Sequence, residues 1–225
     1  MELDRTLPKD QRILLAAEQV FSKHGYERAT VDEIIALADV GKGTVYKYFG
    51  NKEQLFYKLV SAKNEPFVQD LERAVAGASS LTGKFQAYFT TMLTFYREHA
   101  SLWQIILNEM VGCKQGCMVT FVDGKPKVSS KYSLALSSEL EEQILRYFFL
   151  IEKEIDILRG LIREGKNRGL LKSGDMTART LSLFFGVAMS VFFPHGEIGS
   201  LEPEELAKVI VDRFFYGEAT KAPIE

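Results

Sequence analysis

Side chains that could contact a nucleic acid are concentrated in one short stretch of this chain. Residues 42–48 read K-G-T-V-Y-K-Y, so two lysines, one threonine and two tyrosines fall within seven positions. Lysine ammonium groups attract phosphates, and hydroxyl groups donate hydrogen bonds to phosphate and base oxygens. The stretch therefore predicts a DNA-contacting element.

The apolar residues in this stretch predict how it is held. Val45 and Phe49 stand four positions apart, which puts both on one face of a helix over residues 42–49. The remaining side chains are left facing outward, where they can enter a major groove and reach the phosphates on its flanks. Taken alone, a short helix with two lysines is usually just a solvated surface helix, so the neighbouring segments must decide.

The segments around residues 42–49 carry helix start and stop signals. A first helix is predicted from about Pro8 to His24, closed by Gly25. Thr30 and Glu33 form a capping-box pattern that opens a second helix over residues 31–38. A tight turn at residues 39–41 leads into the third helix, and Gly50 closes that helix. This order is helix-turn-helix architecture.

A fourth, longer helix is predicted to follow these three helices. Asn51 is its N-cap, Gln54 stands at the third helical position, and the helix runs from Lys52 into the seventies. Because a helix N-terminus attracts anions, Lys52 at this end is well placed for a phosphate.

The charge distribution supports this interpretation. The formal net charge is only −2, which argues against general polyanion binding. Residues 1–39 hold five Lys or Arg against eight acidic residues, whereas residues 40–60 hold four lysines against Glu53 alone. Positive charge is thus concentrated on the third helix and the start of the fourth, as expected of an element that touches phosphates.

Two blocks of this region resemble the N-terminal domain of the tetracycline-repressor (TetR-type) family. They read A-A-E-Q-V-F-S-K-H-G-Y-E-R-A-T-V-D-E-I and A-D-V-G-K-G-T-V-Y-K-Y-F-G-N-K-E-Q-L, within residues 10–60. The resemblance implies an all-helical homodimer whose N-terminal domains bind a palindromic operator. It also implies a C-terminal domain that dimerises and binds a small-molecule inducer.

The resemblance also implies roles in DNA binding for individual residues. Thr30 would hold a phosphate, and Lys52 would hold the next one. The residues expected nearest the bases are Lys42, Gly43, Thr44 and Lys47, and those expected on backbone oxygens are Tyr46 and Tyr48. Asp39 departs from the glycine frequent in this turn, although Asp tolerates a left-handed conformation. Tyr48 replaces a frequent histidine, and its phenol can still donate to a phosphate.

The rest of the chain also reads as helical. The predicted helices cover about 82–98, 102–111, 136–168, 176–193 and 203–216. The predicted fold class is therefore all-α. We expect a three-helix DNA-binding domain over residues 1–52 and a helical ligand-binding and dimerisation domain over residues 53–225.

The last two predicted helices carry more apolar surface than one core needs. The segment 176–193 is apolar nearly all round, and 203–216 follows it with its own apolar stripe. Both are expected to form a homodimer interface, as the family resemblance implies. The alternative is that they complete the monomer's own core.

An aromatic-rich region in the middle of the chain has two interpretations. One is an ordinary core, which aromatic stripes at helical spacing usually form. The other is a cavity for an apolar or aromatic inducer, lined by Phe89, Met92, Tyr96, Trp103, Ile106 and Phe148. His99 and His195 are single and separated, so neither predicts a metal site.

Residues 112–134 are the least helical part of the chain. The sequences V-T-F-V and K-V-S-S-K-Y around Asp123-Gly124 could form a small hairpin, which Pro126 disfavours, or the whole segment could be a long loop. Cys113 and Cys117 are expected to be free thiols, and a redox or metal sensor is the weaker alternative because no third ligand is evident.

These observations predict a ligand-responsive transcriptional regulator. The sequence shows no nucleophile–base set, no metal-binding cluster and no phosphate-binding loop. We therefore expect no enzymatic activity, cofactor or metal. The N-terminus lacks an apolar signal core and the chain lacks a membrane-length apolar run, so a cytoplasmic protein is expected. We expect a repressor released from its operator by a hydrophobic inducer. The alternative is an inducer-independent structural DNA-binding protein of the same fold.

Overall fold

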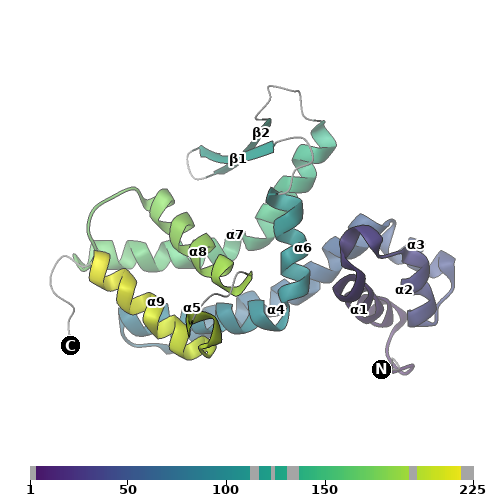
Figure 1. Ribbon diagram of the computed structural model, residues 1–225, viewed down its shortest axis with the longest axis horizontal. Helices are drawn as coiled ribbons and strands as arrows, with labels where there is room; N and C mark the ends of the chain where they lie inside the picture. The colour runs from purple at the N-terminus through teal and green to yellow at the C-terminus, as the bar shows by residue number, and fades with distance from the viewer. Residues whose placement is uncertain (1–3, 112–116, 123–124, 131–136, 193–196, 219–225) are drawn as a thin grey trace.

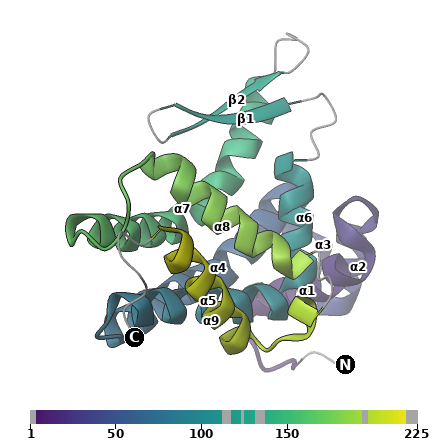
Figure 2. The ribbon, with the colours of Figure 1, turned by 60° about the vertical axis from the view of Figure 1, so that its left-hand side comes forward.

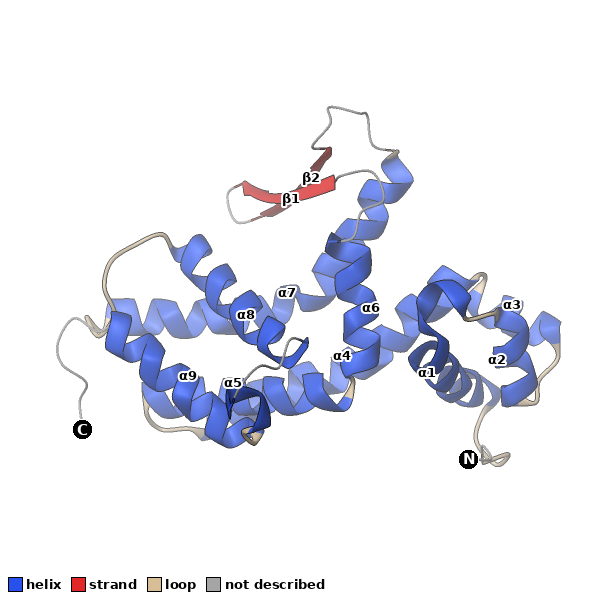
Figure 3. Cartoon of the chain, in the orientation of Figure 1, coloured by secondary structure: helices blue, strands red, loops and turns tan. Residues whose placement is uncertain are grey.

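The computed structural model describes residues 4–111, 117–122, 125–130, 137–192 and 197–218. Within these ranges the chain is mostly helical, with one two-stranded sheet (Figure 3). The elements in chain order are α1 (Lys9–Arg28), α2 (Val31–Ala38), α3 (Lys42–Phe49), α4 (Lys52–Gly77), α5 (Leu81–Glu98), α6 (Ala100–Val111), β1 (Cys117–Val122), β2 (Lys125–Ser130), α7 (Ser138–Asn167), α8 (Met176–Phe192), a 3-10 turn (Glu197–Ser200) and α9 (Pro203–Glu218).

Helix α1 differs from its prediction at its C-terminal end. The backbone leaves helical geometry at Gly25, with φ 71° and ψ 173°, as a closing glycine predicts. Helical geometry then resumes for one turn and ends at Arg28, followed by an Ala29 N–H that donates to the Gly25 carbonyl. The glycine that was predicted to end this helix therefore marks a kink within it.

The local signals around α2, α3 and α4 are confirmed. Thr30 and Glu33 form the predicted capping box, with the Glu33 N–H donating to Thr30 Oγ1 over 3.2 Å. Asp39 adopts the left-handed conformation, with φ 52° and ψ 56°, which ends α2 and starts the turn. Asn51 Oδ1 accepts from the Gln54 N–H over 2.8 Å and opens α4.

The helices form a small head and a larger body. Helices α1–α3 lie at one end of the molecule, and α4 leads from them into a body built of α5 to α9 (Figure 1). In the body, α5 packs against α4, α7, α8 and α9, so it lies centrally (Figure 2). The buried apolar residues of head and body form one continuous core.

The sequence allowed either a hairpin or a long loop within residues 112–134. The structure has a hairpin there, formed by β1 and β2. Strands β1 and β2 pair antiparallel, with Phe121 opposite Pro126 and Val119 opposite Val128, and they pack over α7. A two-stranded sheet consists of edge strands, so β2 tolerates a proline whose missing N–H would break an inner ladder. The predicted helical fold class is confirmed, and this hairpin is the one small sheet within the described residues. Residues 123–124, Cys113 and His195 lie outside the described residues.

Each of the described helices is too short or too polar to cross a lipid bilayer.

Candidate nucleic-acid interface and ligand-domain core

Helix α3 has one thin buried face, as its spacing predicts. Val45 and Phe49 are 2% and 4% exposed, and they pin α3 to the head. Tyr46 and Tyr48 are each 45% exposed, although large aromatic rings are rarely left so open. The outward face of α3 is therefore free to contact a partner.

The basic side chains of this surface are held in different ways. Lys42 pairs with Asp32 of α2 over 3.0 Å, and this hydrogen bond raises the pKa of Lys42. Lys58 Nζ donates to the Tyr48 carbonyl over 2.6 Å, which ties the end of α3 to α4. Lys47 is exposed and forms no ion pair with the residues that the structure describes. Lys47 is thus the most available cation on α3.

Lys52 lies at the junction of α1 and α4. Its Nζ donates to the Glu27 carbonyl over 3.2 Å and lies 4.6 Å from the centroid of the Tyr26 ring. These contacts fix the ammonium group at the N-terminus of α4, where both the helix dipole and the lysine charge favour an anion.

Thr30 is occupied within its own capping box. Both its N–H and its hydroxyl donate to Glu33 Oε2, over 3.0 and 2.9 Å. The backbone and side-chain hydrogen bonds from Thr30 lower the pKa of the Glu33 carboxyl. Both donors of Thr30 are thus engaged by Glu33, and a phosphate held by Thr30 would compete with that carboxylate.

Gly43 and Thr44 complete the N-terminal turn of α3. A Cβ placed on Gly43 would meet no other atom within 4 Å, so this position opens to solvent and permits close approach of a partner. Together with Lys42 and Lys47, these residues form one exposed polar end of α3, at a helix N-terminus that favours anions.

The head matches a known family in sequence. Residues 13–59 match the family described as bacterial regulatory proteins, tetR family. The head is therefore that of a TetR-family transcriptional regulator. Among relatives of the chain, the fatty acid metabolism regulator protein of Bacillus subtilis (strain 168) is 25% identical over 179 residues, covering 80% of this chain and 79% of that protein. The regulator YhgD of the same organism is 24% identical over 134 residues, covering 53% of this chain and 68% of that protein.

Solved structures share the fold of this TetR-family regulator. The fatty acid degradation regulator FadR from Bacillus halodurans superposes with a TM-score of 0.69 at 21% identity, covering 95% of this chain and 98% of that one. FadR from Bacillus subtilis, solved in complex with stearoyl-CoA, gives a TM-score of 0.65 at 21% identity, covering 92% and 98%.

The six residues predicted to line an inducer cavity are all buried in the core of the body. The Tyr96 ring stacks on Trp103 with centroids 4.8 Å apart. Phe89 packs beside Tyr88, and Phe148 meets Phe121 of the hairpin at 5.8 Å. The six residues predicted to line the cavity are Phe89, Met92, Tyr96, Trp103, Ile106 and Phe148. These residues therefore pack as core, and the cavity interpretation stays a prediction.

A buried polar network in the body was missed by the sequence analysis. Glu154 of α7 is 0% exposed, and its Oε2 accepts from the Tyr96 hydroxyl over 2.7 Å. The Tyr88 hydroxyl donates to the Glu154 backbone carbonyl over 3.0 Å. Asn64 of α4 donates from Nδ2 to the Leu150 carbonyl over 2.8 Å. The network joins α4, α5 and α7.

The carboxyl of Glu154 is strongly perturbed. Burial raises its pKa to about 8, against smaller opposing effects of the Tyr96 and Asn64 side chains. One feature of the sequence could have revealed this buried acid. Glu154 interrupts the apolar stripe of α7 between Ile151 and Leu158.

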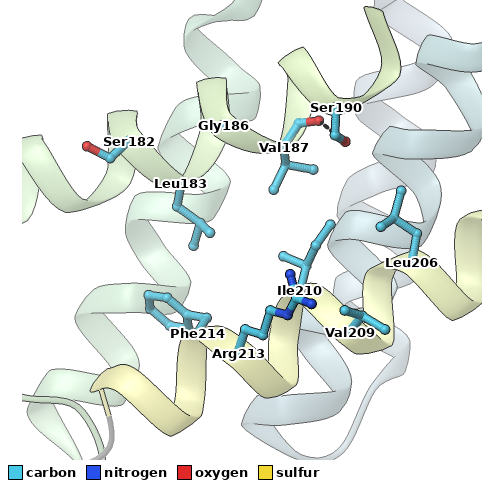
Figure 4. Close-up of a pocket in the computed structure, with 10 residues that line it drawn as sticks. All are labelled: Ser182, Leu183, Gly186, Val187, Ser190, Leu206, Val209, Ile210, Arg213 and Phe214. Carbon is cyan, nitrogen blue, oxygen red and sulfur yellow. Dashed lines mark hydrogen bonds between the residues drawn. The ribbon is translucent and has the colours of Figure 1, made fainter. Parts of the chain in front are cut away.

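A groove of about 420 Å³ separates α8 from α9. Figure 4 shows Leu183 and Val187 of α8 pointing toward Ile210 and Phe214 of α9 across it (Figure 4). Met189, on the same helix α8, is 37% exposed. Helix α9 packs on α5, whereas α8 packs on α5, α6 and α7.

Two ion-pair sites lie where the head meets the body, one of them on the first turn of α4. Glu18 of α1 pairs with Lys63 of α4 over 2.7 Å and lies 3.6 Å from His99, between α5 and α6. Arg146 of α7 pairs with Glu53 in the first turn of α4 over 3.2 Å. A change in the packing of α6 or α7 therefore has direct contacts through which it can tilt the head.

Proposed function

We propose that this regulator is a homodimeric repressor that binds a palindromic operator through α3 and leaves it when a hydrophobic ligand binds the body. The observation that carries this proposal is α3 itself, pinned by Val45 and Phe49 with its polar face exposed. Lys42, Gly43, Thr44 and Lys47 contact bases in the major groove. The phosphates are held by Thr30, Tyr46, Tyr48 and Lys52.

The proposal divides the chain into two domains, and the helix bounds support that division. Residues 1–52 form the DNA-binding domain, and residues 53–225 form the ligand-binding and dimerisation domain, with the boundary at the first turn of α4. A palindromic operator presents half-sites about one helical turn apart, so two heads must be held together by a two-fold dimer.

The dimer interface in this proposal is the outer face of α8 and α9. An apolar groove lined by Leu183, Val187 and Ile210 is the kind of surface that a second copy of the same chain covers. In a two-fold dimer each α8–α9 pair would meet its mate, giving a four-helix interface.

The ligand in this proposal is a long-chain fatty acyl thioester. Two things support it: the relation to the fatty acid metabolism regulator of Bacillus subtilis, and the FadR of that organism, solved with stearoyl-CoA. The aromatic and aliphatic core around Phe89, Tyr96 and Trp103 suits an acyl chain. Release is a population shift, because the ligand favours a body packing that places the heads wrongly for the operator.

The test measures binding of the full chain to duplex DNA from around its own gene, by fluorescence anisotropy with and without stearoyl-CoA. We expect tight binding to one fragment and at least about tenfold weaker binding with saturating ligand. Binding that no acyl-CoA alters would favour the inducer-independent structural DNA-binding protein. Absence of binding to every fragment at low salt would contradict the whole proposal.

A further inference from the structure

The Glu154 network contains two buried oxygens that lack a hydrogen-bond partner. Among the described residues, nothing pairs with Oε1 of Glu154 or with Oδ1 of Asn64. The nearby donors are already used, because the Tyr96 hydroxyl serves Oε2 and the Tyr88 hydroxyl serves the Glu154 carbonyl. An unsatisfied buried polar atom costs about 1–3 kcal/mol, so a protein retains one where something else fills it.

The charge state of Glu154 decides what that partner must be. No Lys, Arg or His of the described chain forms an ion pair with this carboxyl, which is fully buried. A carboxylate without a counter-ion is too costly in such a place, so the group is neutral at physiological pH. Because Tyr96 donates to Oε2, the proton of the neutral acid sits on Oε1. Oε1 is therefore a donor that needs an acceptor.

We propose that the Oε1–H of Glu154 donates a hydrogen bond to the carbonyl oxygen of the ligand's acyl group, and so selects acyl compounds over alkyl compounds of the same length. This inference rests on the ligand domain assigned under the proposed function and deepens it. Asn64, whose Oδ1 also lacks a partner, joins the same network from α4 through its hydrogen bond to the Leu150 carbonyl.

The position of this donor suits a site that signals to the DNA head. Glu154 and Leu150 lie on α7, while Asn64 lies on α4, the helix that begins at the head with Lys52. A ligand carbonyl bound at Oε1 of Glu154 lies one turn along α7 from the Leu150 carbonyl, which holds Asn64 of α4. Ligand binding at Glu154 is thus placed to change the packing of α4 against α7.

Trp103 makes the site directly observable. It is the single tryptophan of the chain and stacks on Tyr96, whose hydroxyl holds Glu154. A ligand that reaches Glu154 must alter the surroundings of this indole, so its fluorescence reports occupancy of the site in the full-length protein.

The experiment compares stearoyl-CoA with S-octadecyl-CoA, a thioether that differs from it by the carbonyl oxygen. Trp103 fluorescence titrations give the affinity ratio of the two compounds. We expect stearoyl-CoA to bind about tenfold more tightly at neutral pH, the value of one buried hydrogen bond. The ratio should fall towards one as the pH rises past 8, because Glu154 loses its proton.

Three variants separate a ligand contact from a structural bond. Glu154→Gln keeps an N–H donor, so the ratio should persist and lose its pH dependence. Glu154→Leu removes the donor and should bring the ratio to about one at every pH. Glu152→Gln, on the exposed side of the same helix, should behave as wild type.

Each other outcome overturns the inference. A wild-type ratio of one shows that Glu154 makes no hydrogen bond to the acyl carbonyl, and the proposed function then stands without this contact. A ratio that survives in a folded Glu154→Leu protein places the donor elsewhere. Failure of both compounds to bind would overturn the inference together with the acyl-thioester ligand, and operator binding would be unaffected.

Discussion

The hydroxyl of Tyr96 lies 2.7 Å from Oε2 of Glu154, inside a body where neither side chain is more than 2% exposed. The pair joins α5 to α7, and Trp103 stacks on the other side of the Tyr96 ring. An acid buried in this way costs stability whenever it is ionised. The relationship therefore makes the stability of the body depend on pH.

The first prediction concerns that pH dependence. Glu154 has a pKa of about 8 in the folded chain, above the value of about 4.3 for an unperturbed glutamate. Between these values the folded state holds one more proton than the unfolded state, so the free energy of unfolding falls as pH rises. The slope from this residue is about −1.4 kcal/mol per pH unit and flattens above the folded pKa.

Urea denaturation at fixed protein concentration, repeated across this pH range, measures that slope. Glu154→Gln should remove this contribution, while Glu152→Gln should leave it in place. An identical slope in wild type and Glu154→Gln would show that Glu154 is ionised, or hydrated, in the folded protein.

The second prediction concerns Lys52. Replacing it with alanine removes one phosphate contact at the N-terminus of α4 without touching the base-reading end of α3. Binding should weaken about equally for operator and unrelated DNA, and the slope of log K against log salt should become shallower by about 1. Lys208→Ala, an exposed lysine on α9, should leave both quantities unchanged. Loss of operator preference alone would mean that Lys52 reads sequence.

The third prediction concerns the α8–α9 face. Ile210→Glu places a charge in the apolar groove, and a charge that must be buried between subunits is strongly unfavourable. Light scattering should show a monomer that keeps its helical circular dichroism, with operator affinity reduced at least about a hundredfold. Lys208→Glu, also on α9 but exposed, should stay dimeric. A dimeric Ile210→Glu protein would place the interface elsewhere.

Sequence reasoning predicted the head well because its signals are local. The Thr30–Glu33 capping box, the left-handed Asp39 and the Asn51 cap each act within a few residues, and each is present as expected. The bounds of α3 were predicted to the residue for the same reason.

The body was harder to predict because its specific contacts are long-range. The bond from Asn64 to the Leu150 carbonyl spans 86 positions, and the bond from Tyr96 to Glu154 spans 58. Helical periodicity shows that Tyr96 faces inward, but it cannot show which polar group it meets there. Aromatic spacing likewise cannot distinguish a cavity wall from a packed core, as Trp103 illustrates.

The central claim, that the exposed face of α3 selects a DNA sequence, is tested most directly by the Lys47→Ala variant. The measurement is the affinity of the full-length protein for its operator fragment and for a scrambled duplex at the same salt, compared with wild type. We predict that the preference for the operator falls by about 1–3 kcal/mol, while binding to the scrambled duplex changes little. An unchanged preference in both Lys47→Ala and Thr44→Ala would contradict the account.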